Sequence, residues 1–294
     1  RSFTWTFTGA KGQGQAGWTS FGFIVALLGL ITAWTVAFGT KESTSALRAK
    51  AQKNGNPFEA FKALFQNDQL LWVALSYLLY AIANVATTGV LIFLFKFILD
   101  NQAAYSLTGV IALVAGLVMA PLYPILNKRI PRRYLYIGGM ISMIAGYVML
   151  GIFSDNIIMV FVALVLFYVP GTLIQMTAIL SLTDSIEYGQ LKNGKRNEAV
   201  TLSVRPMLDK IAGACSNGIV GFIAVAAGMI GDATAADMTA ANIGMFKVCA
   251  FYVPLGIIVL SLLVFLFKVK ITEKMHDEIV EELEAKLASG EISE

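Results

Sequence analysis

The stretch QLLWVALSYLLYAIANVATTGVLIFLFKFIL (residues 69–99) decides the fold class of this chain, because a single charged residue, Lys96, interrupts it. A helix needs roughly 20 predominantly apolar residues to cross the hydrocarbon core of a bilayer, and this stretch exceeds that length. Six further apolar stretches are also long enough, at about 18–39, 104–126, 134–153, 157–182, 200–230 and 243–268. The sequence therefore predicts an all-α membrane protein with seven spans.

The basic residues indicate how these spans are oriented. Most of the Lys and Arg residues fall in alternate connections, Lys41–Lys62, Lys128–Arg133, Lys192–Arg196 and the tail from Lys268. The connections between those contain neither residue type: Asp100–Ser106, Ser154–Asn156 and Gly231–Asn242. Cytoplasmic loops carry an excess of Lys and Arg. We therefore expect the basic loops and the C-terminus to be cytoplasmic and Arg1 to be external.

Composition supports a membrane protein and argues against a nucleic-acid partner. Hydrophobic residues make up 57% and charged residues 14% of the 294 residues, whereas soluble domains carry about 25% charged residues. The net charge of +3 comes from short loops and not from a basic arm or patch. The bilayer is thus the predicted environment, with no nucleic acid as partner.

The polar connections divide the chain into four predicted segments. Residues 1–40 form an external loop and the first span. Residues 41–68 form a middle loop, in which an amphipathic helix follows Pro57. Residues 69–268 form a bundle of six spans, and residues 269–294 form a tail helix. Apolar residues recur on one face of that tail, at Met275, Ile279, Leu283 and Leu287. This spacing predicts a helix that docks on the bundle, and the single histidine, His276, receives no chemical role.

Three ionisable residues lie deep in the sixth stretch and are the main candidates for a ligand site. Arg205, Asp209 and Lys210 occupy positions where a charge costs about 2.5–3.5 kcal/mol at the centre of a span. Arg205 and Asp209 are four residues apart and share a helical face. Lys210 is about ten residues beyond Val200, or roughly 15 Å into the membrane. We expect these side chains to face an aqueous cavity or each other.

Two amides are weaker candidates for the same site. Asn84 in the second stretch and Gln175 in the fifth can hydrogen-bond a polar solute. Hydrogen bonding between helices explains such residues equally well. Both alternatives stay open at this point.

The sequence contains no arrangement for covalent chemistry. With one histidine, in the tail, it offers no Ser-His-Asp arrangement, no HExxH, no phosphate-binding loop and no metal-ligand cluster. Cys215 and Cys249 lie in apolar stretches and are interpreted as packing residues. We predict a non-enzymatic secondary transporter without a resident cofactor or metal. A non-transporting membrane sensor or scaffold is the alternative from another class.

One long motif resembles a known transporter family. LTDSIEYGQLKNGKRNEAVTLSVRPMLDKIAGACSNGIVGFIAVAAGM (residues 182–229) is similar to bacterial lactose and raffinose permeases of the glycoside-pentoside-hexuronide:cation symporter family, within the major facilitator superfamily. QNDQLLW (residues 66–72) and KITEKMHDEIVEELE (residues 270–284) extend the resemblance. It implies that the chain carries the last helix of an N-terminal bundle and the six-helix C-terminal bundle of a twelve-helix fold, with a five-helix N-terminal segment missing.

The resemblance also implies roles for individual residues. Lys210 falls on a lysine near the family's sugar and cation sites, and Glu198 on an acidic residue of the coupling region. Lys195 stands where the lactose permeases have a histidine. Five further residues resemble a cytoplasmic charge network, which in the family is expected to hold the two bundles together when the transporter is closed to the cytoplasm: Asp184, Glu187, Arg196, Arg132 and Arg133.

The implied activity is symport of a galactoside or related oligosaccharide with H⁺ or Na⁺, by alternating access in a bacterial cytoplasmic membrane. Tyr77 and Tyr80 are candidates to stack on a sugar ring. A pentoside or glucuronide symporter, or an exchanger of lactose for galactose, is the alternative among transporters.

Overall fold

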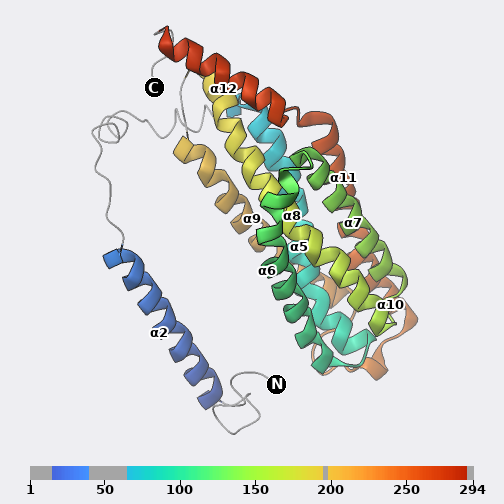
Figure 1. Ribbon diagram of the computed structural model, residues 1–294. Helices are drawn as coiled ribbons and strands as arrows, with labels where there is room; N and C mark the ends of the chain where they lie inside the picture. Colours follow the sequence, from blue (N-terminus) through green and yellow to red (C-terminus); the bar gives the residue numbers. More distant parts are fainter. Residues whose placement is uncertain (1–14, 40–64, 195–197, 290–294) are drawn as a thin grey trace. The chain divides into compact units, whose positions relative to one another are not determined.

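The computed structural model describes residues 15–39, 65–194 and 198–289 (Figure 1). The chain divides into two compact units, Arg1–Gly55 and Asn56–Glu294. The first contains the helix α2 (Gln15–Gly39). Most of the amphipathic helix predicted after Pro57 lies outside the described residues, as do Lys195 and Arg196.

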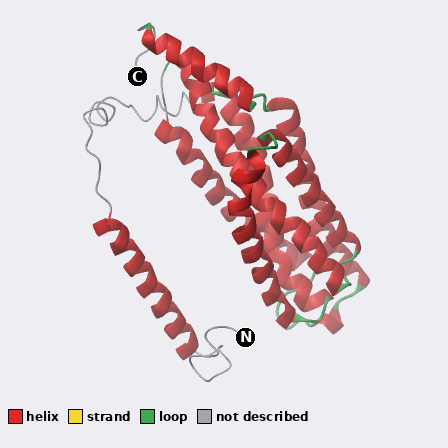
Figure 2. Cartoon of the chain, in the orientation of Figure 1, coloured by secondary structure: helices red, strands yellow, loops and turns green. Residues whose placement is uncertain are grey.

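All regular structure in the described part of the chain is helical (Figure 2). Seven of the described helical segments are long and apolar enough to cross a membrane, at 19–39, 68–98, 102–127, 132–152, 157–193, 200–226 and 240–268. Each coincides with one of the predicted stretches. The predicted all-α class with seven spans is therefore confirmed for the described residues.

The second unit contains six of these spans and a tail helix. In chain order its described elements are α5 (Asp68–Phe93), η1 (Leu94–Ile98), η2 (Gln102–Tyr105), α6 (Ser106–Asn127), α7 (Arg132–Ile152), α8 (Ile157–Asn193), α9 (Glu198–Ala226), η3 (Ala235–Asp237), α10 (Ala240–Lys247), η4 (Val248–Tyr252), α11 (Val253–Lys268) and α12 (Glu273–Ala288). The segments η1 and η4 are π-helical, and η2 and η3 are 3₁₀ helices.

The helix α8 is longer than its hydropathy predicts. The apolar stretch ends near residue 182, but the helix continues to Asn193 and ends at Gly194, which has a φ of 69°. The continuation is polar in sequence and still buries one face, including Ile186, Gly189 and Gln190. Packing of that face keeps the segment helical after the hydropathy signal has stopped.

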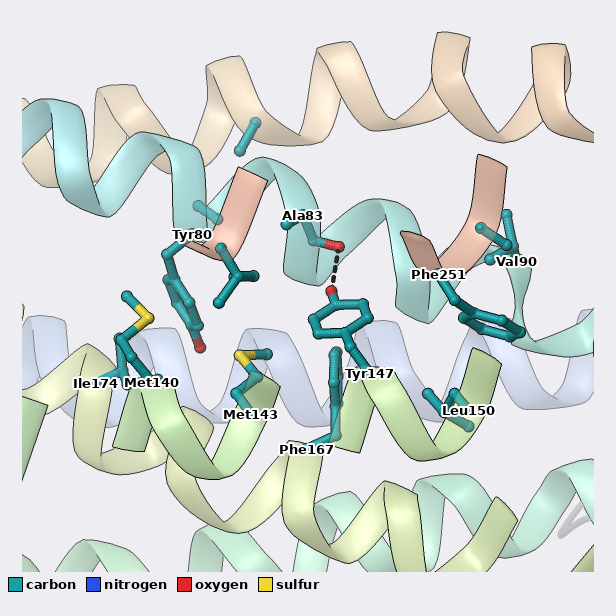
Figure 3. Close-up of a cluster of buried hydrophobic side chains, with 14 of the residues drawn as sticks. Tyr80, Ala83, Val90, Met140, Met143, Tyr147, Leu150, Phe167, Ile174 and Phe251 are labelled. Atoms are coloured by element: carbon teal, nitrogen blue, oxygen red, sulfur yellow. Dashed lines mark hydrogen bonds between the residues drawn. The ribbon is translucent and has the colours of Figure 1, made fainter. Parts of the chain in front are cut away.

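The helix α5 lies at the centre of the second unit, where it packs against α8, α9 and α11. Its buried face joins aromatic and sulfur-containing side chains of α7 and α8 (Figure 3). The hydroxyl of Tyr147 donates to the carbonyl of Ala83 at 3.0 Å and lies 2.9 Å from the hydroxyl of Thr87. These bonds satisfy a tyrosine hydroxyl that has no access to water.

The start of α5 is bound to two other helices. Asn67 caps α5 by accepting from the backbone N–H of Leu70 at 3.0 Å, and its side-chain amide donates to the carbonyl of Ser185 in α8 at 2.7 Å. Gln69 accepts from the backbone N–H of Lys270 at 2.8 Å, just beyond the end of α11. The start of α5 is therefore joined to α8 and to the chain just beyond α11 by the side chains of Asn67 and Gln69.

Gly189 permits the contact between α5 and α8, and replacing it by alanine is expected to lower stability. A Cβ at this position would lie 2.6 Å from the side-chain nitrogen of Asn67. Asn67 must then move, which breaks two hydrogen bonds of about 0.5–1.5 kcal/mol each. We expect Gly189→Ala to reduce the free energy of unfolding by about 1–2 kcal/mol, measured as a lower melting temperature in detergent.

Gly138→Ala is the matched control for this prediction. Gly138 lies within α7 and nothing would come within 4 Å of its Cβ. Alanine there should instead stabilise the helix, by about 0.5–1 kcal/mol. Equal melting temperatures for the two variants would contradict the proposed role of Gly189.

Candidate functional site

A cavity of about 610 Å³ lies between α5, α6, α8 and α9. The two amides predicted from the sequence, Asn84 and Gln175, both line it. The full lining is Tyr80, Asn84, Val85, Thr88, Gly89, Ala112, Phe167, Tyr168, Gly171, Thr172, Gln175, Ser216, Asn217 and Val220. The structure thus brings polar side chains of α5, α8 and α9 together around this cavity.

The lining of this cavity combines polar and apolar side chains, and none of the described residues in it is charged. Amides and hydroxyls provide both donors and acceptors, and aromatic rings form part of the wall. Asn84 donates to the hydroxyl of Tyr80 at 3.0 Å, and that hydroxyl donates to the carbonyl of Gly171 at 3.2 Å. Such a lining suits a neutral solute with many hydroxyl groups, because each hydroxyl both donates and accepts.

The deep charges of α9 contact α5 at Tyr77. The hydroxyl of Tyr77 donates to Oδ1 of Asp209 at 2.7 Å. Nε of Arg205 lies 4.0 Å from Oδ2 of Asp209, which is an ion pair but too long for a hydrogen bond. Within the described residues, Nε of Arg205 is buried and has no hydrogen-bond partner. The structure therefore brings two of the three predicted deep charges together.

Lys210 does not join this pair. Its side chain is exposed on the surface of the second unit and is not among the residues that line the cavity. In the described part of the chain no ion pair or hydrogen bond of its side chain is found. Lys210 lies near the middle of the candidate span at 200–226, so its ammonium group requires water or a partner.

Sequence reasoning missed Ser216 and Asn217, although the helical spacing of α9 indicates them. Ser216 follows Asp209 by two helical turns and therefore lies on the same face. This face approaches α5 closely, since a Cβ at Gly89 would lie 2.7 Å from Cγ2 of Val220. The charged pair, Arg205 and Asp209, and the polar cavity residues Ser216 and Asn217 thus lie along the same interface between α5 and α9.

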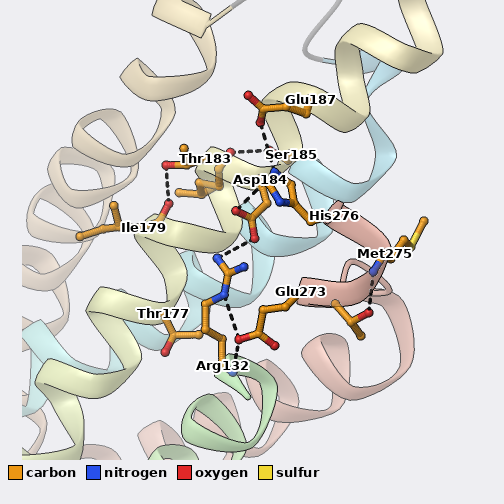
Figure 4. Close-up of polar contacts among 12 residues, drawn as sticks. Arg132, Thr177, Ile179, Thr183, Asp184, Ser185, Glu187, Glu273, Met275 and His276 are labelled. Atoms are coloured by element: carbon orange, nitrogen blue, oxygen red, sulfur yellow. Dashed lines mark hydrogen bonds and ion pairs between the residues drawn. The ribbon is translucent and has the colours of Figure 1, made fainter. Parts of the chain in front are cut away.

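A second polar cluster joins α7, α8 and the tail helix α12 (Figure 4). One guanidinium nitrogen of Arg132 lies 2.7 Å from Oδ2 of Asp184. Oε1 of Glu273 accepts from Nε of Arg132 at 3.2 Å and from its backbone N–H at 2.9 Å. Because that N–H belongs to the first residue of α7, Glu273 also stabilises the start of this helix.

His276 belongs to the same cluster, which sequence reasoning did not expect. Its Nε2 lies 3.9 Å from Oδ1 of Asp184 and 3.7 Å from Oε2 of Glu187. Ile279 and Leu283 on the same face of α12 are buried. The predicted docking of the tail helix on the bundle is therefore observed, with α8 as its principal neighbour.

The other predicted site residues have different surroundings. Arg133 donates to the carbonyls of Leu266 and Val269, at 2.8 and 3.0 Å, and so binds the end of α11. Glu198 is the first residue of α9, is exposed and does not line the cavity. Among the described residues, no group of three or more side chains is suited to hold a metal ion.

Comparison with known proteins places this helical fold in a family. The sequence profile described as MFS/sugar transport protein matches residues 3–273. The chain belongs to this family. Membership agrees with a multi-pass membrane protein whose candidate spans are those described above.

Relatives with high similarity to this chain are named for sugar transport. A lactose permease of Leuconostoc lactis is 50% identical over 98% of the chain, and one of Lactobacillus helveticus is 46% identical over 98%. A raffinose carrier protein of Pediococcus pentosaceus is 38% identical over 91%. The chain spans only 45%, 45% and 42% of the length of these three relatives.

Proposed function

We propose that this chain is the C-terminal part of a secondary transporter that carries a neutral galactoside or related oligosaccharide across a bacterial cytoplasmic membrane. Transport is coupled to H⁺ or Na⁺ and proceeds by alternating access. Three similar proteins named lactose permease or raffinose carrier protein support the proposal. In relatives of that length, the first helix of this chain would complete an N-terminal bundle.

The observation that carries the proposal is the cavity between α5, α6, α8 and α9, whose described lining is uncharged and combines amides and hydroxyls with apolar side chains. Its volume of about 610 Å³ falls in the range of about 300–1,000 Å³ typical of small-molecule sites. Amides and hydroxyls offer hydrogen bonds to sugar hydroxyls, and Tyr80 and Tyr168 offer aromatic surface. A glucuronide would place a carboxylate among these groups without a cation in the lining. The cavity therefore favours a neutral sugar over a hexuronide.

The coupling ion is proposed to bind at the charged side of the same contact between α5 and α9. Arg205, Asp209 and Lys210 lie within a candidate span, where ionisable groups mark ion and substrate pathways. Glu198 and Lys195 are proposed to take part at the inner end of α9. Carboxylates of the N-terminal bundle would complete the site.

The second polar cluster is proposed to be part of an inner gate. Arg132 and Asp184 form an ion pair of 2.7 Å at one end of the bundle, and Glu187 lies 3.7 Å from His276 of the same cluster. Arg196 is proposed to join them. Ion pairs at such a surface stabilise one conformation over another without contacting the ligand. Glu273 and His276 extend this gate to the tail helix.

Uptake by the full-length transporter in proteoliposomes tests the proposal. We expect lactose to accumulate only when an inward H⁺ or Na⁺ gradient is imposed. Gln175→Ala removes hydrogen bonds to the sugar and should raise its KM by roughly 2–10-fold, because one such bond contributes about 0.5–1.5 kcal/mol. Gln102→Ala removes the same side chain in η2, outside the cavity, and should leave KM unchanged.

Other outcomes would identify the alternatives. Uptake of a glucuronide but of no neutral galactoside would favour the hexuronide symporter. Exchange of lactose for galactose without any response to ion gradients would favour an exchanger. Absence of both binding and transport of sugars would favour a membrane sensor or scaffold.

A further inference from the structure

Tyr77 connects the charged pair of α9 with the wall of the cavity. Its side chain is 2% exposed, and its hydroxyl lies 2.7 Å from Oδ1 of Asp209. One turn further along α5 is Tyr80, whose ring centroid is 5.8 Å from that of Tyr77 and which lines the cavity. Asn84 follows on the same face. A single face of α5 therefore contacts both the carboxylate and the proposed sugar space.

The two oxygens of Asp209 have different partners. Oδ1 accepts the short hydrogen bond from Tyr77, whereas Oδ2 lies 4.0 Å from Nε of Arg205. The second distance is too long for a hydrogen bond, although Nε is buried and has no other hydrogen-bond partner among the described residues. The only short bond that the described residues make with this carboxylate thus comes from a neutral donor.

This difference matters because a hydrogen-bonded ion pair with Arg205 would leave Oδ2 of Asp209 unavailable to a cation. A charge-assisted hydrogen bond between arginine and a carboxylate is about twice as strong as a neutral one. To form such a bond, the Asp209 side chain would have to rotate toward Arg205, because Oδ2 now lies 4.0 Å from Nε. The bond from Tyr77 opposes that rotation, since the ring of Tyr77 is fixed by the packing around it.

We infer that Tyr77 is a positioning residue that holds Asp209 out of full contact with Arg205 and so leaves Oδ2 accessible to the coupling cation. The inference rests on the proposed cation-coupled transport and adds the residue that sets the geometry of its ion site. Tyr77 is not among the residues that line the cavity, and in this inference it acts through Asp209. Its place on the face of α5 that also lines the cavity puts the ion site one helical turn from the sugar.

Replacement of Tyr77 by phenylalanine tests this inference, because it removes the hydroxyl and keeps the ring. Without the hydroxyl, Asp209 can pair with Arg205, and the cation must compete with that bond. We expect the cation concentration for half-maximal lactose uptake to rise about tenfold, as a hydrogen bond to a charged group contributes about 1.5 kcal/mol or more. The KM for lactose at saturating cation should change less than about twofold.

Tyr136→Phe is the matched control. Tyr136 is also buried, its hydroxyl lies 2.9 Å from the neutral hydroxyl of Ser76, and it does not line the cavity. Its loss should not move the cation dependence. Arg205→Gln in the Tyr77→Phe background removes the competing cation and should lower the half-maximal cation concentration again, relative to Tyr77→Phe alone.

The outcomes separate this inference from the proposed function. If the wild-type transporter shows no response to ion gradients, the proposed function fails. If the wild type responds and Tyr77→Phe has an unchanged cation dependence, only the role of Tyr77 is overturned. An equal rise in the half-maximal cation concentration in Tyr136→Phe would also overturn the role of Tyr77, because the effect would then come from a general loss of packing. Melting temperatures of all variants, measured in detergent, identify any that do not fold.

Discussion

Lys210→Ala is expected to abolish accumulation of sugar against its gradient by the full-length transporter. Lys210 lies near the middle of a candidate span, exposed on the surface of the second unit. A charge at that depth costs about 2.5–3.5 kcal/mol and is retained only where water, a ligand or an opposite charge stabilises it. We propose that carboxylates of the N-terminal bundle and the sugar hydroxyls do so during transport. Gradient-driven uptake of radiolabelled lactose measures the effect.

A simple charge-balancing role for Lys210 makes a different prediction. If Lys210 only neutralised its neighbour Asp209, the double variant Lys210→Ala with Asp209→Asn would restore accumulation. The structure argues against that, because Asp209 already has Arg205 and Tyr77 as partners. Lys96→Ala removes a lysine near the end of a span, where the ammonium group lies over the ring of Phe97, and should retain transport. Active accumulation by the double variant would contradict the mechanism.

Asp184→Arg is expected to have the second largest effect, on the balance between inward-open and outward-open states. Asp184 and Arg132 are 2.7 Å apart, and their side chains are only 12% and 14% exposed. Breaking such a pair costs about 3–5 kcal/mol, because a buried charge loses its partner. A difference of about 3 kcal/mol changes an equilibrium by roughly a hundredfold. We propose that this pair is intact only when this end of the bundle is closed, so the closed state should lose most of its population.

Labelling of cysteines introduced on the external side of the transporter reports this shift. We expect the external labelling rate to fall as inward-open molecules become dominant, while the affinity for lactose changes less than in Lys210→Ala. Asp155→Arg is the control, because Asp155 is an exposed residue in the loop between α7 and α8. Unchanged labelling and transport in Asp184→Arg would contradict a role of the Arg132–Asp184 pair in the inner gate.

Much of the fold could be predicted because hydropathy over a span-length window is a strong signal. The predicted stretch at 134–153 differs from the observed span at 132–152 by one or two residues at each end. The extension of α8 to Asn193 could not be predicted in this way. Its residues are polar, and they remain helical because Ile186 and Gly189 pack on other elements, which only the tertiary structure reveals.

The candidate site was predictable where a polar residue is conspicuous in an apolar span. Asn84 and Gln175 stand out in sequence, and both line the cavity. Ser216 does not stand out by type, and its spacing from Asp209 is the signal that places it on the same face. His276 lies three residues before Ile279, so the buried face of α12 indicates its direction. Its partners on α8 come from a distant part of the sequence, which no local pattern reveals.

The junction at the start of α5 has a mechanical consequence. Asn67 binds α8 through the carbonyl of Ser185, and Gln69 binds the chain just beyond α11 through the backbone N–H of Lys270. Between them, Asp68 accepts a hydrogen bond from the hydroxyl of Tyr188 at 2.9 Å. Tension applied to the chain ahead of Asn67 is therefore distributed over three helices at once. These hydrogen bonds resist the separation of α5 from α8 and from the chain just beyond α11 when that connection is pulled.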